Sequence, residues 1–170
     1  MKNYSIAFFF TMVSFFICYH NSNAQVKNIL IGGNLTGGPA IGDFKNGYKS
    51  VFGLEGFIGG GSEKVFGLLT AGYFSYSAQD GNIYGKIKML PLKGGLRIYA
   101  TKKLFLAGNA GIGLLKDEVM TSSESRFVYD MGAGFHNGLG SISVFYDGWV
   151  RKNNNGTSNT IQVKLGFALR

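Results

Sequence analysis

Apolar and polar residues alternate one by one along the last third of the chain. From Arg126 to His136 every odd position is apolar, and most even positions are polar or glycine. Residues 160–170 repeat the pattern, with Ile161, Val163, Leu165, Phe167 and Leu169 on one face. A period of two is typical of a β-strand with one apolar and one polar face. The pattern therefore predicts long strands with two different faces.

The same alternation, together with the turn residues between segments, predicts eight strands. Their ranges are 26–35, 47–59, 63–76, 83–99, 103–115, 125–136, 140–151 and 159–169. The connections 36–46, 78–82, 116–124 and 152–158 are long and rich in Gly, Asn, Ser and charge, and the connections between them are short. Alternating long and short connections are typical of an up-and-down antiparallel barrel, with loops at one end and turns at the other.

Strand length favours a barrel that spans a membrane. A strand of about 11 residues rises about 36 Å, and a tilt of about 40° reduces this height to about 28 Å, near the 25 Å apolar band of membrane barrels. Strands of soluble proteins average about five or six residues. The prediction is an all-β fold, an up-and-down antiparallel eight-stranded transmembrane β-barrel.

The two faces of the strands can be assigned from their chemistry. We expect aliphatic residues such as Leu92 on the fourth strand, Leu106 on the fifth and Val144 on the seventh to face lipid. The charged residues expected to face the lumen are Glu55, Lys93, Arg97, Arg126, Asp130, Asp147, Arg151 and Lys164. Eight strands leave an interior that side chains just fill, and buried charges must be paired. The prediction is a closed, salt-bridged lumen, and the alternative is a lumen that conducts or binds a ligand.

The turn near Gly138 decides which lumen charges face each other. If the turn centres on Gly138 and Leu139, Asp130 lies opposite Asp147, an unfavourable pairing of like charges. If Asn137 and Gly138 form a type I′ turn instead, these pairs become diagonal. The second register is the preferred prediction, with Lys164 and the arginines as partners of the acids.

Aromatic residues and a proline give two further expectations. The aromatics Tyr48, Phe74, Tyr76, Tyr84, Phe127 and Tyr129 near the loop ends, and Phe66, Phe135 and Phe167 near the turn ends, are predicted to form interfacial girdles. Pro91 lies inside the fourth strand, where it removes a ladder hydrogen bond. We therefore expect a bulge at residues 89–92.

The N-terminus has the features of an export signal. Lys2 precedes an apolar run at residues 6–19, and small residues at Ser22 and Ala24 end the segment. This order predicts a signal peptide over residues 1–24, cleaved after Ala24, and a mature domain over residues 25–170. The alternatives are a transmembrane helix, for which the run is short, and a lipoprotein acylated at Cys18. Cys18 is the single cysteine, so the mature chain is expected to have no disulfide.

Charge and motifs exclude several kinds of activity. The net charge is +8, but the basic residues are scattered and an export signal precedes them, so no nucleic-acid partner is expected. Anionic lipid head groups fit the basic surface better. Only His136 remains after the signal, so no metal, cofactor or catalytic site is expected. The one alternative, a His–Ser pair of His136 with Ser141 or Ser143, would lie at the turn end of the lumen.

The segment from Lys88 to Tyr99 contains a proline within a strand and is followed by an apolar strand at 104–115. This hairpin resembles those of the small outer-membrane β-barrel proteins of diderm (Gram-negative) bacteria. The resemblance implies location in the outer membrane and insertion by the assembly machinery of that membrane, which reads the last strand. Residues 164–169, with Gly166 and Leu169, resemble this signal, although the chain ends in Arg170 and lacks the usual terminal aromatic residue.

The expected role is non-catalytic. The sequence favours an integral outer-membrane barrel that serves envelope structure, adhesion or surface interaction through its extracellular loops, with an unknown surface ligand. The alternative class is a soluble exported eight-stranded barrel that binds an apolar ligand, and a small pore is a third possibility. The apolar face of the strands distinguishes the first two, because a soluble barrel would turn this face toward the lumen.

Overall fold

The computed structural model describes residues 28–81, 85–117, 123–152 and 156–170. The predicted signal peptide (residues 1–24), its cleavage site and the girdle residue Tyr84 lie outside these ranges. No helix within the described residues is long and apolar enough to cross a lipid bilayer.

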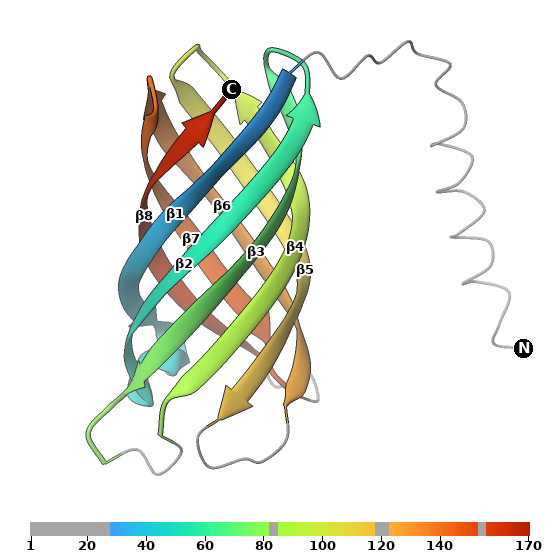
Figure 1. The fold of residues 1–170 in the computed structure, drawn as a ribbon. Coiled ribbons are helices and arrows are strands. Elements are labelled where there is room, and N and C mark those ends of the chain that lie inside the picture. The colour runs from blue at the N-terminus through green and yellow to red at the C-terminus, as the bar shows by residue number, and fades with distance from the viewer. Residues whose placement is uncertain (1–27, 82–84, 118–122, 153–155) are drawn as a thin grey trace, which may run out of the picture.

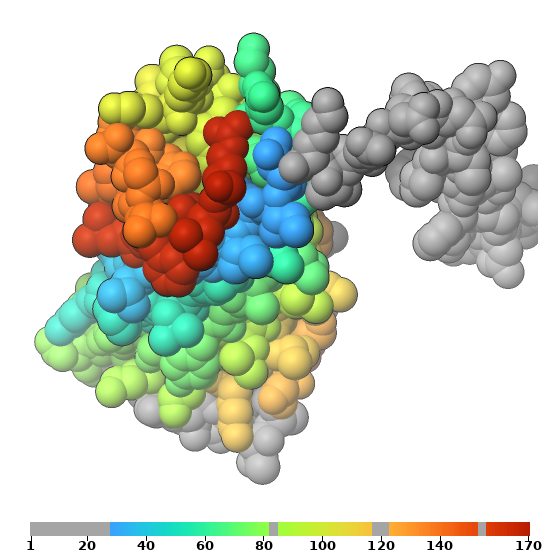
Figure 2. Space-filling model, turned by 45° about the horizontal axis from the view of Figure 1, so that its top comes forward, coloured from blue at the N-terminus to red at the C-terminus, as the bar shows by residue number. Residues whose placement is uncertain are grey.

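Eight strands form one closed antiparallel barrel in sequence order, which confirms the predicted fold (Figure 1). The strands are β1 (Asn28–Ile41), β2 (Tyr48–Gly61), β3 (Val65–Ala78), β4 (Ile87–Tyr99), β5 (Leu104–Asp117), β6 (Glu124–Asn137), β7 (Gly140–Val150) and β8 (Thr157–Leu169). A 3₁₀ helix, η1 (Gly42–Asn46), lies between β1 and β2. The last strand pairs with the first to close the barrel, and Figure 2 shows β8 in red against β1 in blue.

The two ends of the barrel differ in their connections. The start of β1 and the C-terminus lie at one end with the short connections 62–64, 100–103 and 138–139, here named the turn end (Figure 1). The helix η1 and the ends of β3, β5 and β7, which are separated from the next strand by longer stretches of sequence, lie at the other end, the loop end. This alternation is the predicted one.

Large apolar side chains cover the outside of all eight strands, and their exposure confirms the predicted outward-facing positions of β4, β5 and β7. We name this surface the apolar belt, which includes Ile31, Leu54, Leu69, Leu92, Ile112, Met131, Val144 and Leu165. The residues between them along each strand point into the lumen and are buried, such as Lys93 beside Leu92. The barrel is therefore apolar outside and mixed inside.

The aromatic residues do not all lie where the sequence predicted. Phe127, Phe135 and Phe167 are exposed on the outer surface, as expected for girdles. Four others expected there, Tyr48, Phe66, Phe74 and Tyr76, are buried in the lumen, which corrects the prediction. The error came mainly from β3, because that strand has apolar residues on both faces.

Strand β1 continues to Ile41, whereas the sequence predicted an end at residue 35. The segment Gly37–Pro39 has the composition of a loop, but Gly38 pairs with Val51 and Pro39 with Ser50. A Cβ atom on Gly38 would lie 1.8 Å from the carbonyl oxygen of Ile161 on β8. Glycine is therefore required here by the close approach of two strands.

Pro91 lies in β4 without the expected bulge. The pairing of β4 with β5 keeps one register from Ile87–Asp117 to Tyr99–Phe105. On the other side, the pairs Ala71–Leu92 and Phe74–Met89 have the same register, and Pro91 lies between them. Proline thus removes a ladder bond toward β3 without the insertion of an extra residue.

The turn between β6 and β7 also differs from the preferred prediction. Asn137 pairs with Gly140, and Asp130 lies directly opposite Asp147, so the slipped register is wrong. Gly138 has a φ of 63°, and glycine first in a two-residue loop is the pattern of a type II′ turn. The repulsion between the two carboxylates is offset by Lys93, whose Nζ contacts both.

Phenylalanines in the lumen lie over glycines on the neighbouring strand. The pairs, each directly opposite in register, are Gly32–Phe57, Gly53–Phe74, Gly132–Phe145 and Gly134–Phe105. In each pair a Cβ atom on the glycine would lie less than 3 Å from the ring. An absent side chain on one strand thus makes room for an aromatic ring of the next, which fills the narrow interior.

Because of this packing, replacement of a lumen glycine by alanine should destabilise the barrel more than the same replacement on the outer face. Gly134→Ala should lower the free energy of unfolding by about 1–3 kcal/mol, because the methyl group would overlap the Phe105 ring. The matched control is Gly108→Ala on the outer face of β5, where the nearest atom is 3.8 Å away. Urea unfolding followed by fluorescence of Trp149, the single tryptophan, measures both variants. Equal losses would contradict the packing described here.

Candidate functional site

Five buried charged residues meet in the middle of the lumen. Lys93 Nζ forms a hydrogen-bonded ion pair with Asp130 and lies 3.7 Å from Glu55 and 3.6 Å from Asp147. Lys164 Nζ lies 2.8 Å from Glu55 and 3.5 Å from Asp130. We name this group, contributed by β2, β4, β6, β7 and β8, the charge cluster. It links strands that are not neighbours in the barrel.

Neutral side chains complete the polar contacts of the charge cluster. Asn34 Nδ2 donates to Glu55 Oε1 at 3.0 Å, and Asn109 Nδ2 donates to Asp130 Oδ1 at 2.6 Å. Each asparagine lies directly opposite its carboxylate on the neighbouring strand. Such hydrogen bonds reduce the cost of removing a carboxylate from water.

Arg97 is buried in the lumen but lies apart from the charge cluster. Its guanidinium group lies between the rings of Phe57 and Phe105, 4.5 Å and 4.4 Å from their centroids. Its Nε and Nη1 atoms have no hydrogen-bond partner among the described residues. The charge cluster has three carboxylates and two ammonium groups, so Arg97 supplies the positive charge that makes the buried charges equal in number.

Arg126 and Arg151 do not join the charge cluster. Arg126 forms an ion pair with Glu124, and Arg151 Nε donates to Ser158 Oγ at 3.0 Å, both at the loop end. Arg126 is the third residue of β6, and Arg151 directly follows the last residue of β7. Water reaches them there, so they are not partners for the acids in the middle of the lumen.

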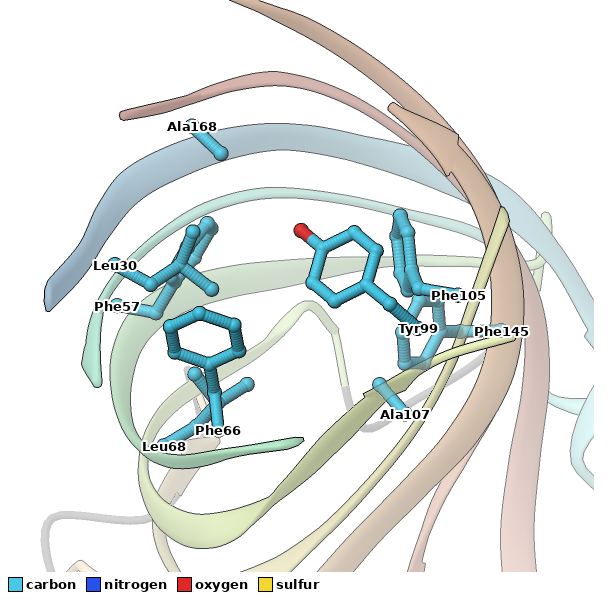
Figure 3. Close-up of a cluster of buried hydrophobic side chains, with 9 residues drawn as sticks. All are labelled: Leu30, Phe57, Phe66, Leu68, Tyr99, Phe105, Ala107, Phe145 and Ala168. Atoms are coloured by element: carbon cyan, nitrogen blue, oxygen red, sulfur yellow. The ribbon is translucent and has the colours of Figure 1, made fainter. Parts of the chain in front are cut away.

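An apolar layer closes the lumen on the turn side of the charge cluster. Nine buried side chains form it, namely Leu30, Phe57, Phe66, Leu68, Tyr99, Phe105, Ala107, Phe145 and Ala168 (Figure 3). The rings come from strands on opposite sides of the barrel and point toward one another. Arg170 covers this layer from outside, with its guanidinium 4.8 Å from the Tyr99 ring centroid.

A second apolar layer closes the loop side of the lumen. Here η1 folds inward, and Phe44 stacks on Tyr48 at 4.7 Å between ring centroids. Phe44 also contacts the edges of Trp149, at 4.8 Å, and Tyr76, at 5.8 Å. The charge cluster is therefore enclosed between two layers of aromatic and aliphatic side chains.

His136 does not form the alternative pair with a serine. It lies opposite Ser141 in register, but its Nδ1 atom is 3.2 Å from Tyr99 Oη. Its Nε2 atom has no hydrogen-bond partner among the described residues. A nucleophile and its base must lie within hydrogen-bond reach. Across all of the described residues, no group of three or more His, Cys, Asp and Glu side chains could hold a metal ion.

The sequence matches no protein-family model and no curated protein sequence. The structure is similar to the outer membrane protein Ail of Yersinia pestis in a phospholipid bilayer nanodisc, with a TM-score of 0.56 and 15% identity. That match covers 83% of this chain and 98% of Ail. The N-terminal β-barrel domain of Pseudomonas aeruginosa OprF is also similar, with a TM-score of 0.55 and 15% identity over 82% of this chain and 97% of that domain. The chain has the fold of the eight-stranded outer-membrane β-barrels.

This outer-membrane β-barrel fold confirms the likeness that the Pro91 hairpin and the strand pattern indicated. A further match is the crystal structure of Ail in complex with the heparin analogue sucrose octasulfate, with a TM-score of 0.50 and 16% identity. It covers 83% of this chain and 96% of that one. At such identities the shared property is the fold, so the role of each residue has to come from the geometry of this barrel.

Sequence reasoning missed several residues that fill the lumen of this barrel. Phe44 belongs to a predicted loop, and Thr36 was placed at the start of the same loop. Thr36 is buried and donates to Gln162 at 2.9 Å. In the structure each even position from Leu30 to Thr36 is buried. The alternation of Asn34 and Thr36 with Leu35 in the sequence was a usable signal for this strand. The glycines at 37 and 38 obscured it.

The two apolar layers predict that this barrel does not conduct ions. In planar-bilayer recordings the wild-type protein should give no steady channels, because η1 and the turn-side layer block both ends of the charge cluster. Phe44→Ala removes one ring from the loop-side layer and leaves the turn-side layer intact, so it should also remain closed. Steady ion-selective channels of the wild type would show that the lumen is a pore.

Proposed function

We propose that the chain is an integral outer-membrane β-barrel protein with no catalytic role, which acts through the loops at its loop end. The apolar belt is the observation that carries this proposal. It surrounds the barrel, whereas the lumen contains the charge cluster. Transmembrane barrels have such an apolar outer band with polar residues inside. Lipid of the outer membrane is therefore the first partner.

The faces argue against a soluble barrel with an apolar ligand. Such a barrel needs an apolar lumen with free space and a polar outer surface. Here the middle of the lumen is filled by Lys93, Lys164 and the three acids that they contact, and both ends are closed by packed side chains. A continuous apolar surface of this size in water would also cause aggregation.

The last strand supports insertion by the outer-membrane assembly machinery. In β8, Leu165, Phe167 and Leu169 face outward, whereas Lys164 faces the lumen. The segment that resembles the assembly signal therefore has an apolar face on the outside of the barrel. We propose that the assembly machinery reads this strand before it pairs with β1.

The loop end supports a surface-interaction role. Basic residues outnumber acidic ones there among the described residues, and Lys45 and Lys152 are exposed. The similar protein Ail was solved with a sulfated heparin analogue. We propose an anionic surface ligand for the loops of this chain and no nucleic-acid, metal or cofactor partner.

Membrane fractionation combined with a heat-modifiable gel shift tests the membrane assignment. The protein should appear in the outer-membrane fraction and migrate differently before and after boiling. Recovery in the soluble periplasmic fraction would contradict the proposal.

Cysteine labelling of intact cells tests which end faces outward. Because Cys18 is the only cysteine, single substitutions report without background once the signal is removed. A membrane-impermeant maleimide should label Asp80→Cys at the loop end, where the side chain is 96% exposed, and should leave Lys102→Cys at the turn end unlabelled. The opposite labelling would place the loops in the periplasm and exclude a role at the cell surface.

A further inference from the structure

Two lysines face each other across neighbouring strands on the outer surface. Lys88 on β4 and Lys116 on β5 are directly opposite in register. Both side chains are exposed, and they point outward like Leu90 and Leu114, their neighbours on the same face. The Cβ atoms of directly opposite residues lie about 4.5–5.5 Å apart, and like charges at this distance are destabilising.

No acidic side chain neutralises this lysine pair among the described residues. Other lysines at the loop end do have acidic partners. Lys49 Nζ lies 2.6 Å from Asp80, and Lys152 Nζ lies 3.3 Å from Glu124. Ser75 lies opposite Lys88 on β3, and Glu124, which lies opposite Leu115 in register, pairs instead with Arg126 and Lys152. An anion from outside the chain would remove the repulsion.

The position of the lysine pair relative to the apolar belt suggests the source of this anion. Leu90 and Leu114 form the next outward pair toward the middle of the barrel, followed by Leu92 and Ile112. The ammonium groups therefore lie at the edge of the apolar belt that faces the loop end. In a membrane this level is the head-group layer, where lysine stems can lie along apolar surface while their charges remain in the polar layer.

We propose that Lys88 and Lys116 bind a phosphate group on the head group of an outer-leaflet lipid. This inference rests on the proposed membrane location with the loop end outward. A phosphate group can accept from both ammonium groups at once, and lysine binds phosphate as a point charge. The Ser75 hydroxyl, beside Lys88, adds a neutral donor. The lipid acyl chains then lie along Leu90, Leu92, Ile112 and Leu114, on the turn side of the pair.

Native mass spectrometry of the folded barrel in detergent, titrated with diphosphoryl lipid A, tests the proposal. The variant Lys88→Gln/Lys116→Gln should bind this lipid about thirtyfold more weakly than the wild type, from about 1 kcal/mol for each lysine near an anionic surface. Lys88→Arg/Lys116→Arg should keep most of the affinity. The matched control is Lys64→Gln/Lys102→Gln, which removes the same charge at the turn end and should bind as the wild type does.

Three outcomes would overturn the proposal. Equal weakening in the turn-end control would show attraction by net charge alone. Unchanged binding of the same lipid after removal of its phosphates would show that the acyl chains are recognised instead. Displacement of the lipid by millimolar inorganic phosphate would identify a free ion as the ligand. The heat-modifiable gel shift confirms that each variant is folded, and failure of the fractionation experiment would separately refute the membrane location.

Discussion

Replacing Lys93 by methionine is expected to lower the free energy of unfolding by about 3–5 kcal/mol, because the removal of one partner leaves buried charges uncompensated. Lys93 contacts Glu55, Asp130 and Asp147, whereas Lys164 contacts only the first two among the described residues. Lys93→Met should therefore be more harmful than Lys164→Met. Urea unfolding in lipid vesicles, followed by Trp149 fluorescence, gives both values.

A second variant separates charge from packing in this experiment. Asp147 lies opposite Asp130, and within the described ranges its one ion-pair partner is Lys93. Lys93→Met combined with Asp147→Asn removes a cation and one of the two facing anions, so part of the lost stability should return. Lys102→Met, an exposed substitution at the turn end, should change stability little. If Lys93→Met lowers the free energy of unfolding as little as Lys102→Met does, the ion pairs of the charge cluster do not stabilise the barrel.

Arginine in the apolar belt should prevent stable insertion into lipid. Leu92 is 56% exposed and lies next to Lys93, near the middle of β4. Leu92→Arg should cost about 2–4 kcal/mol, the cost of a lipid-facing arginine near the bilayer midplane. Refolding into lipid vesicles followed by protease protection measures the effect.

Leu139 provides the matched control for this substitution. It is 64% exposed but lies in the β6–β7 turn, outside the apolar belt. Leu139→Arg should refold as well as the wild type. If Leu92→Arg is tolerated equally, the outer surface of the barrel faces water, and the soluble alternative is favoured.

The barrel architecture could be predicted from the sequence because the alternation of apolar and polar residues indicates which side of each strand faces the lumen. On β5 and β8 every large apolar residue predicted to face outward does so. The other face of β8 has only small or polar residues, and that of β5 has mostly such residues apart from Phe105 and Leu115. On β3 both faces carry apolar residues, and the alternation gives no direction there. Phe66, Phe74 and Tyr76 were therefore assigned to the wrong side.

The lumen was harder to predict because its contacts depend on register. A shift of one turn position decides whether Asp130 faces Asp147, and the unfavourable pairing made the other register look preferable. The structure shows that a third strand supplies the compensation, through Lys93 of β4. Pairwise reasoning about one hairpin does not include such a partner. The same limit applies to the Gly134–Phe105 packing, which only the register reveals.

The closure between β1 and β8 has a consequence for how the barrel forms. These are the first and the last strand, so their pairing joins the residues of the sheet that are farthest apart in sequence. Until they pair, each is an open edge that can join another chain, and such long-range pairing is slow. Pro39 lies within β1 in a gap of the β1–β8 ladder, between the pairs Gly37–Val163 and Ala40–Thr160. Pro39 interrupts the β1–β8 pairing in the closed barrel. Before closure, the same proline makes the exposed edge of β1 less able to pair with a strand of another chain.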